Sequence, residues 1–377
     1  LSSIRSFIFG PMRDDEVLSS IDVSVAFLQA NEFDEDEKPR YVKYTPYKGA
    51  RTQYYKLRGP LYGQRSSPRR WFDTLKEWLT SKEMGFVQGK NEVCAFVNPK
   101  TGVKLVAWVD DLLVKGTDRE TQQFYKALAD KFDCKDPSYL TVDSPLDYVG
   151  FTVELHDMGD GQREISIDQT SQVQDFLEEF ECPPAKFAGV ASPCFTKTAL
   201  YSDDTPLSEE DRARYTSIVG SLNYFATSLR YDIALPTSKL SQFMAKPTVG
   251  AMQGAVRVMQ YMGATSDFSL RGRVTEQCDY IHYSDSDHAG DKPYHTRSQS
   301  GILLTLNKVP VQWKSNKQSC TAYSSTAAEV MALSECVRQA NFLQWAGKDI
   351  GYNEPPTLTI YTDSKGARAF QSSTTLD

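Results

Sequence analysis

The sequence lacks the features that mark membrane, secreted and zinc-binding proteins. None of its apolar runs reaches the length needed to span a bilayer, which excludes a transmembrane helix as an organising element. Its seven cysteines are scattered and odd in number, and none forms a Cys-x-x-Cys pair. That distribution argues against a zinc site or a disulfide framework, and for a reducing compartment. We find no secretory leader before the first motif, no internal repeat and no low-complexity segment.

What remains is the composition of a folded protein with an uneven charge distribution. The 377 residues are 40% hydrophobic and 12% aromatic, which fits two or three globular domains with ample core. The net charge of −7 hides a basic segment, because residues 38–76 carry eleven Lys or Arg and a single acid, Asp73. Aromatic residues interleave with these cations, which predicts a nucleic-acid track, with a solvated surface strip as the alternative. The acidic run at residues 32–37 is interpreted as an exposed loop without chemistry.

Residues 107–114, A-W-V-D-D-L-L-V, are the most informative stretch. Two acids, Asp110 and Asp111, separate two short apolar runs, which predicts a β-hairpin with the acids at its tight turn. Adjacent like charges raise each other's pKa unless a cation joins them. Mg²⁺ prefers carboxylate oxygens and often bridges to phosphates, so the pattern predicts a magnesium site.

This hairpin resembles the catalytic hairpin of reverse transcriptases, and polymerases that use two metal ions need a further carboxylate on a neighbouring strand. Asp22, between Ile21 and Val23 at the start of an apolar stretch, is the candidate. The alternative for Asp22 is a helix N-cap. The presence of the hairpin favours the metal-binding interpretation.

A second group of acids lies toward the other end of the sequence. Residues 280–287, 301–306, 309–313 and 358–363 are predicted strands, and residues 326–345 are a predicted helix. Asp285 and Asp363 fall at strand ends and Glu329 falls in the first helical turn. This order of elements and acids resembles the ribonuclease H pattern, in which the acids hold two Mg²⁺ ions about 3.5–4 Å apart across a scissile phosphate.

Each of these acids also has a structural alternative. Thr326 and Glu329 match a capping box, and Asp363 could cap a helix that begins at Ser364. Asp287 and Asp291 could be ordinary turn residues. Between residues 292 and 328 there are five basic residues and no acid, among them Lys314 and Lys317, which suits the phosphates of a hybrid duplex.

Together these motifs resemble one family, over nearly the whole chain: the reverse transcriptase and ribonuclease H segment of copia-type LTR retrotransposon polyproteins. The motifs that carry the resemblance are D-V-S-V-A-F-L at 22–28, L-Y-G-Q-R-S-S-P-R-R-W-F at 61–72, V-D-D-L at 109–112, Y-V-G-F at 148–151, Y-T-S-I-V-G-S-L-N-Y at 215–224, R-Y-D-I-A at 230–234, Y-S-D-S-D-H-A-G-D at 283–291, S-S-T-A-A-E at 324–329 and Y-T-D-S at 361–364.

The resemblance implies an α+β fold. A right-hand polymerase with fingers, palm, thumb and helical connection would be followed by a ribonuclease H-like mixed α/β domain. The implied borders are 1–155 for a fingers remnant and palm, 156–190 for the thumb with a helix at 171–181, 191–275 for the connection, and 276–377 for a ribonuclease H-like domain that is C-terminally incomplete.

The resemblance also implies roles for individual residues. The metal-binding catalytic acids would be Asp22, Asp110 and Asp111 for polymerisation, and Asp285, Glu329 and Asp363 for hydrolysis. Phe27 would be a steric gate against a ribose 2′-hydroxyl, and Tyr62, Gly63 and Arg65 would line the nucleotide. Val149 and Gly150 would grip the primer, and Arg69, Arg70, Lys314 and Lys317 would bind nucleic acid.

The implied cofactor is Mg²⁺, two ions per active site, with Mn²⁺ as an alternative. The implied partners are an RNA template, a DNA primer, an RNA–DNA hybrid, dNTPs and other parts of the polyprotein, with no membrane. The implied location is a cytoplasmic virus-like particle or the nucleus.

The sequence also departs from the family pattern. Both ends look cut relative to the family, and Tyr231 stands where the connection usually has proline. We therefore expect this chain alone to hydrolyse RNA weakly or not at all. The alternative function is a catalytically decayed retroelement remnant that only binds nucleic acid.

Overall fold

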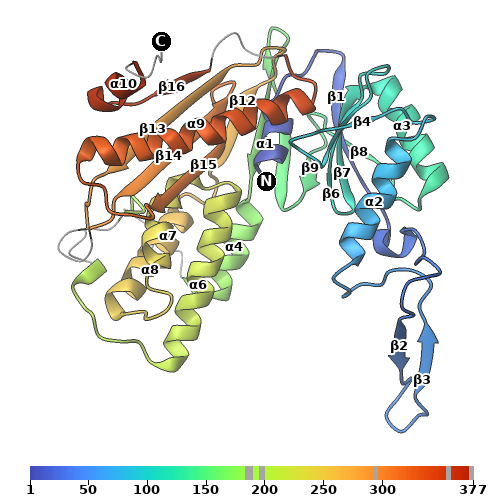
Figure 1. Cartoon of the computed structure of the whole chain (residues 1–377), viewed down its shortest axis with the longest axis horizontal. Coiled ribbons are helices and arrows are strands. Elements are labelled where there is room, and N and C mark those ends of the chain that lie inside the picture. The colour runs from blue at the N-terminus through green and yellow to red at the C-terminus, as the bar shows by residue number, and fades with distance from the viewer. Residues whose placement is uncertain (183–189, 195–199, 292–295, 354–357, 373–377) are drawn as a thin grey trace. The chain divides into compact units, whose positions relative to one another are not determined.

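The computed structural model describes residues 1–182, 190–194, 200–291, 296–353 and 358–372 (Figure 1). The chain divides into two compact units. The smaller unit comprises residues 14–140 and 349–351, and the larger unit comprises residues 1–13, 141–348 and 352–377. Both units mix helices with sheets, which agrees with the predicted α+β class. Among the described residues, no helix is long and apolar enough to cross a membrane.

The smaller unit is built on a six-stranded antiparallel sheet with the order β4-β5-β6-β7-β1-β8. Its elements are β1 (Glu16–Asp22), the 3-10 helix η1 (Ala26–Gln29), β2 (Tyr41–Tyr44), β3 (Gln53–Lys56), α2 (Ser67–Leu79), β4 (Val87–Gln88), β5 (Ala95–Val97), β6 (Lys104–Trp108), β7 (Asp111–Thr117), α3 (Asp118–Lys131) and β8 (Ser138–Tyr139). β2 and β3 form a separate two-stranded sheet that extends away from the rest of this unit (Figure 1).

The core of the smaller unit follows from the alternation of its central strands. Leu105 of β6 and Leu112 of β7 are fully buried in one cluster. Trp71 of α2 and Phe124 of α3 belong to the same cluster, so these helices cover one face of the sheet. The α3 helix starts where the Thr117 side chain accepts a hydrogen bond from the backbone N–H of Glu120, 3.3 Å away, as an N-cap should.

The larger unit contains two four-stranded sheets, with the orders β12-β11-β10-β9 and β15-β14-β13-β16. Its elements are α1 (Ser2–Phe9), β9 (Leu146–Tyr148), β10 (Phe151–Gly159), β11 (Gln162–Asp168), α4 (Thr170–Glu179), α6 (Glu209–Ser228), the 3-10 helix η3 (Tyr231–Ile233), α7 (Ala234–Ser241), α8 (Val249–Ala264), β12 (Ser269–Arg273), β13 (Tyr280–Asp287), β14 (Gln299–Leu306), β15 (Val309–Lys317), α9 (Ser325–Asp349), β16 (Thr359–Tyr361) and α10 (Lys365–Ser372). The predicted helix at 171–181 is confirmed as α4.

The last sheet has the element order that the sequence predicts. Strands β13, β14 and β15 pair antiparallel in sequence, α9 follows, and β16 pairs parallel with β13. In Figure 1 the long α9 helix lies along this sheet. Gln312 of β15 donates a hydrogen bond to the Gln339 side chain of α9 over 3.0 Å, and the buried face of α9 carries small residues such as Ala332 and Cys336. Small side chains let the helix approach the strands closely.

A buried arginine fixes the N-terminal helix in the larger unit. The Arg5 guanidinium donates hydrogen bonds to the carbonyl oxygens of Val311 (2.8 Å) and Thr227 (3.1 Å) and lies 4.1 Å from the ring centroid of Trp313. Burial lowers the pKa of Arg5 to about 9. These contacts join α1 to β15 and α6 within one unit.

The compact units follow borders of their own. Residues 1–13 and 141–155, which the sequence groups with fingers and palm, pack with the larger unit. The predicted borders at 155, 190 and 275 separate functional domains. The division into compact units does not test them, so they stay predictions. All seven cysteines are free, which agrees with the predicted absence of a disulfide framework.

Candidate functional site

The predicted hairpin at residues 107–114 is confirmed. Trp108 of β6 pairs with Asp111 of β7, which leaves Val109 and Asp110 as a two-residue turn. Val109 has a φ of 58°, a left-handed conformation that is costly for a β-branched residue. The indole N–H of buried Trp71 donates a hydrogen bond to the Val109 carbonyl over 2.6 Å. The hydrogen bond from Trp71 of α2 therefore holds the turn in a strained conformation.

Asp22 is the last residue of β1 and lies directly opposite Asp111 in the β1–β7 ladder. Directly opposed residues of an antiparallel pair project to the same face, with Cβ atoms about 4.5–5.5 Å apart. The backbone N–H of Val23 donates to the Asp110 carbonyl over 2.9 Å, which fixes the strand end against the turn. The helix N-cap alternative for Asp22 is wrong, because Asp22 ends a strand and Val25 precedes the next helical turn.

Burial and neighbouring negative charges both disfavour the ionised form of Asp111. Burial raises the pKa of Asp111 to about 6, and the neighbouring charges of Asp110 and Asp22 add to the effect. The ammonium of Lys135 lies 3.2 Å from the Asp22 carboxylate and offsets part of the repulsion. Carboxylate oxygens gathered at a sheet edge are the donor set that a hard divalent cation prefers.

The residues predicted to contact the nucleotide lie on η1 and on the loop before α2, both in the smaller unit. The rings of Phe27 and Tyr62 are 4.7 Å apart between centroids, and Tyr62 is half exposed. Gly63 has a φ of +90°, which a residue with a Cβ adopts only under strain. Arg65 is exposed one turn before α2. The contact between Phe27 and Tyr62 joins η1 to the loop before α2.

Arg69 and Arg70, predicted to bind nucleic acid, each have an acidic partner. Arg69 pairs with Asp73 on the exposed side of α2 over 2.8 Å. Arg70 pairs with Glu37 and lies 4.9 Å from the ring centroid of Phe33. The acidic run at 32–37 is a largely exposed loop, as predicted, and its last acid, Glu37, forms the ion pair with Arg70.

The two residues predicted to grip the primer form the β9–β10 turn in the larger unit. Tyr148 pairs with Phe151, so Val149 and Gly150 alone make the turn. Both have positive φ, 49° and 76°. A Cβ at Gly150 would lie 3.0 Å from the Tyr224 hydroxyl, so a larger residue would displace that side chain.

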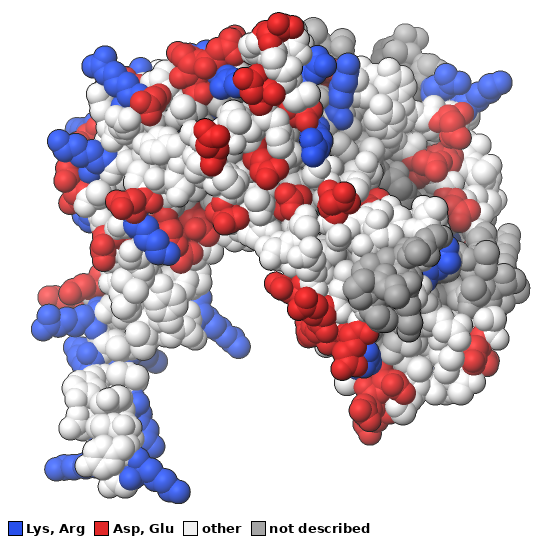
Figure 2. Space-filling view, turned by 180° about the vertical axis from the view of Figure 1, so that it is seen from behind, with Lys and Arg blue, Asp and Glu red and all other residues white. Residues whose placement is uncertain are grey.

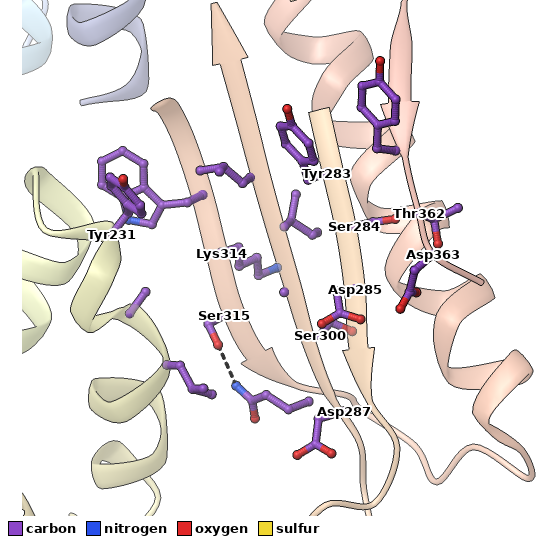
Figure 3. Close-up of a pocket in the computed structure, with 18 of the residues that line it drawn as sticks. Tyr231, Tyr283, Ser284, Asp285, Asp287, Ser300, Lys314, Ser315, Thr362 and Asp363 are labelled. Carbon is purple, nitrogen blue, oxygen red and sulfur yellow. Dashed lines mark hydrogen bonds between the residues drawn. The ribbon is translucent and has the colours of Figure 1, made fainter. Parts of the chain in front are cut away.

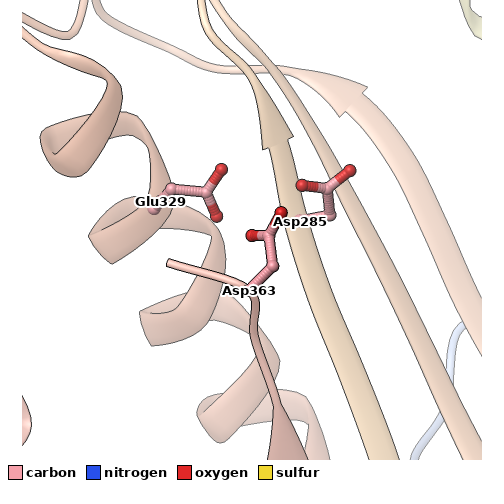
Figure 4. A group of neighbouring side chains, drawn as sticks. All are labelled: Asp285, Glu329 and Asp363. Atoms are coloured by element: carbon pink, nitrogen blue, oxygen red, sulfur yellow. The ribbon is translucent and has the colours of Figure 1, made fainter. Parts of the chain in front are cut away.

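The second predicted group of acids comes together in the larger unit (Figure 4). Asp285 of β13, Glu329 of α9 and Asp363 after β16 each offer a carboxylate oxygen within 4.8 Å of the others. Burial raises the pKa of Glu329 to about 7, and Asp285 and Asp363 add to the shift. Such a cluster is stable in its charged form only when a cation is added.

The capping alternatives for this group are wrong. The Ser324 hydroxyl accepts the hydrogen bond from the Ala327 N–H over 3.1 Å and so caps α9. The Ser364 hydroxyl does the same for the Ala367 N–H at α10, over 3.1 Å. Neither Glu329 nor Asp363 is needed as a cap.

A cavity of about 530 Å³ opens beside these acids (Figure 3). Tyr283 and Asp285 line it from β13, and Tyr231 lines it from η3. Two basic residues of β15 lie nearby with their ammonium groups engaged. Lys314 pairs with Glu335 over 2.9 Å and Lys317 bonds to Gln242 over 2.9 Å.

The other two acids of this motif lie at the end of β13 and in the turn that follows it. Asp291 pairs with Lys239 of α7. The Asp287 carboxylate lies against Gly290, where a Cβ would collide with it. Asp291 occupies a turn, as the sequence alternative describes, whereas Asp287 does not, because it is the last residue of β13 and pairs with Gln299.

Comparison with known proteins agrees with the motif pattern. Residues 1–186 match the family described as reverse transcriptase (RNA-dependent DNA polymerase). The chain is 28% identical, over 96% of its length, to the retrovirus-related Pol polyprotein from transposon RE1 of Arabidopsis thaliana. It is 25% identical, over 97% of its length, to that of transposon TNT 1-94 of Nicotiana tabacum, and 25% identical, over 92%, to the Ty1-DR5 Gag-Pol polyprotein of Saccharomyces cerevisiae. These similarities support a fragment of a copia-type retrotransposon polyprotein.

The copia-type chain spans 22% of the Arabidopsis RE1 polyprotein, 27% of the tobacco one and 20% of the yeast one. The likeness to these relatives extends beyond residue 186, through the part that carries Asp285, Glu329 and Asp363.

Sequence reasoning missed one residue at the first acid group of this copia-type chain. Lys135 follows α3 and reaches Asp22 in two ways, through its ammonium at 3.2 Å and through its backbone N–H, which donates to the Asp22 carbonyl over 3.0 Å. A lone lysine after a helix carries no recognisable pattern, so only the fold identifies it.

Proposed function

We propose that this chain is an RNA-directed DNA polymerase with an attached ribonuclease H, acting in retrotransposon replication. The observation that carries the proposal is the Asp22–Asp111 cross-strand pair beside the Asp110 turn, inside the segment that matches the reverse transcriptase family. The substrates would be an RNA template, a DNA primer and dNTPs. The proposed setting is a cytoplasmic particle that also holds the rest of the polyprotein.

In this proposal the smaller unit supplies palm and fingers. Its six-stranded sheet would be the palm, and the β2–β3 hairpin would belong to the fingers. Helix α4 would belong to the thumb, α6 to α8 to the connection, and the β13–β16 sheet with α9 to the ribonuclease H domain.

The residues at the first acid group fit a divalent metal. They offer carboxylate oxygens only, and burial, together with the charges of Asp110 and Asp22, raises the pKa of Asp111, so that a bound cation would stabilise the ionised form. Asp22, Asp110 and Asp111 would hold the metal. When bound, two such ions supply Lewis acidity toward the primer 3′-oxygen and the leaving pyrophosphate.

The other residues of the site would position the reactants. Trp71 holds the turn that carries Asp110 through its hydrogen bond to Val109. Phe27, packed against Tyr62, would exclude a ribose 2′-hydroxyl by its bulk. Lys135 would keep a positive charge beside Asp22 where phosphates arrive.

The second acid group would hydrolyse the RNA strand of a hybrid. Asp285, Glu329 and Asp363 also offer oxygen ligands only, and burial, together with the two neighbouring carboxylates, raises the pKa of Glu329. These three residues would hold the metal that polarises the phosphodiester and activates water. The hybrid would approach over the cavity lined by Tyr283, with Lys314 and Lys317 of β15 beside its phosphates.

The test is extension of a 5′-labelled DNA primer on an RNA template with dNTPs and Mg²⁺. We expect extension by the parent chain, loss on chelation, and loss of at least about 1,000-fold in Asp110→Asn, the order expected when one reacting-centre stabiliser is removed. Asp130→Asn, an exposed acid on α3, is the matched control and should extend normally. Extension that survives Asp110→Asn would refute the proposal.

A further inference from the structure

The β2–β3 hairpin has two faces of different chemistry. Tyr41 pairs with Lys56 and Lys43 pairs with Tyr54, so these four side chains share one face. Val42 pairs with Tyr55 and Tyr44 with Gln53, which places those side chains on the other face. Both lysines of the two strands therefore project to the same side.

On the Tyr41/Lys43/Tyr54/Lys56 face, each lysine stands opposite a tyrosine, so rings and cations alternate in both directions. Tyr41 is 61% and Tyr54 68% exposed, and both lysines are exposed. Among the residues that the structure describes, neither lysine has an acidic partner and neither tyrosine contacts another ring. Figure 2 shows cations and no acids on the protruding hairpin.

On the opposite face of the hairpin, the side chains contact one another. The rings of Tyr44 and Tyr55 pack against each other at 6.4 Å between centroids, and the Tyr55 hydroxyl donates to the Gln53 side chain. This face carries no charge. Its two tyrosine rings contact each other, and each is 51% exposed.

We propose that the Tyr41/Lys43/Tyr54/Lys56 face binds single-stranded nucleic acid, the lysines pairing with phosphates and the tyrosine rings stacking on unpaired bases. The inference rests on the proposed function in one respect, which is that the bound strand is taken to be the RNA template. Stacking platforms combined with cations are the common way in which proteins bind single strands without reading sequence.

The chemistry of the face favours a single strand over a duplex. In a duplex the bases stack on one another and present their edges, so flat exposed rings find no base face to cover. Two exposed rings on one side of a narrow hairpin instead match successive splayed bases. A protein partner would need acids placed opposite both lysines, whereas a single strand supplies phosphates and base faces in regular alternation.

The experiment is fluorescence anisotropy with a labelled single-stranded RNA and a duplex of equal length, using the 377-residue chain without dNTPs. Tyr41→Ala/Tyr54→Ala should weaken single-strand binding by roughly ten-fold or more, because a stacked base is worth about 1–3 kcal/mol. Tyr41→Phe/Tyr54→Phe keeps the rings and should bind like the parent. Lys43→Gln/Lys56→Gln should lower the slope of log K against log salt by about 1.4, since each phosphate contact on a single strand contributes about 0.7.

The matched control is Tyr44→Ala/Tyr55→Ala on the other face, which should bind within two-fold of the parent. Equal losses in the two alanine pairs, or a loss in the phenylalanine pair, would overturn the stacking role. Duplex affinity should change less than single-strand affinity in Tyr41→Ala/Tyr54→Ala, and an equal change would favour a simple electrostatic surface.

The outcome is separable from that of the proposed function. Asp110→Asn should keep full single-strand affinity while losing extension. If no variant extends a primer but the tyrosine and lysine effects appear, the polymerase proposal fails and the binding face stands. If extension is normal and the face variants bind like the parent, only this inference fails.

Discussion

Asp22 and Asp111 face each other across the β1–β7 ladder, and the turn that carries Asp110 continues directly from that pair. Three acids thus meet at one edge of a sheet although one of them is remote in sequence. Their mutual repulsion, with burial as the larger cause, raises the pKa of Asp111 to about 6. The cluster costs the fold stability unless a cation binds, which makes it testable by stability as well as by activity.

Asp111→Asn should stabilise the metal-free protein at neutral pH. The folded-state pKa of about 6 lies above the ordinary 3.8, so the ionised carboxylate costs stability above about pH 6. That cost disappears as pH falls below about 4. Thermal unfolding in a chelator should therefore show a variant Tm above the parent's at pH 8 and a shrinking gap toward pH 4. A gap that is constant with pH would show that Asp111 bears no extra charge repulsion.

Phe27→Ala should relax sugar discrimination. The ring packs on Tyr62 at 4.7 Å, and removing it opens space beside the proposed nucleotide site. Single-nucleotide incorporation should show rNTP use rising by about ten-fold or more relative to dNTP use, an effect of about 1.4 kcal/mol or more in the barrier. Tyr62→Phe, which keeps the ring contact, is the control. An unchanged ratio in Phe27→Ala would assign Phe27 to packing alone.

Val109→Gly should not destabilise the protein, although valine-to-glycine changes usually do. Val109 has a φ of 58° and is 45% exposed, so glycine relieves strain while little burial is lost. We expect a gain of about 1 kcal/mol, the difference between strain of about 1–3 kcal/mol and the entropy cost of glycine. Val114→Gly, at a fully buried position of β7, should lower Tm by several degrees. If both variants lose stability equally, the turn is not strained.

Glu329 should make metal binding at the second acid group depend on pH. Its pKa of about 7 means that a proton competes with the cation below neutrality. In an Asp110→Asn background, which silences the first group, the Mn²⁺ concentration for half-saturation should rise about ten-fold per pH unit below about pH 7. Glu329→Gln should bind Mn²⁺ more weakly and without this pH dependence. Equal affinity of the parent background at pH 6 and pH 8 would contradict the assignment.

Local patterns in the sequence foretell the elements well. The strand at 280–287 and the hairpin at 107–114 are visible because alternation and tight-turn residues are local properties. The caps are less visible, since Thr326 and Glu329 match a capping box while Ser324 makes the hydrogen bond. Neighbouring hydroxyls compete for one N–H group, and only the backbone geometry decides between them.

The sequence predicts which acids are grouped, but not the strand register or the charged contacts that surround them. The register that sets Asp22 opposite Asp111 depends on how all of β1 packs, and a shift by one residue would turn Asp22 to the other face. Lys135 reaches Asp22 from the segment after α3. Glu37, in the acidic run to which no role was assigned, pairs with Arg70. Arg5 joins its helix to β15 through a backbone carbonyl group. Every residue has such a group, so the sequence does not show which one Arg5 contacts.

The most direct measurement follows both chemistries on one hybrid, with the DNA primer and the RNA template carrying different labels. Parent, Asp110→Asn and Asp285→Asn would be compared with Mg²⁺ and dNTPs. The account predicts that Asp110→Asn loses primer extension, while Asp285→Asn extends like the parent and loses whatever RNA cleavage the parent shows. Extension that survives Asp110→Asn, or that disappears in Asp285→Asn, would contradict the assignment of polymerisation to the Asp22, Asp110 and Asp111 group.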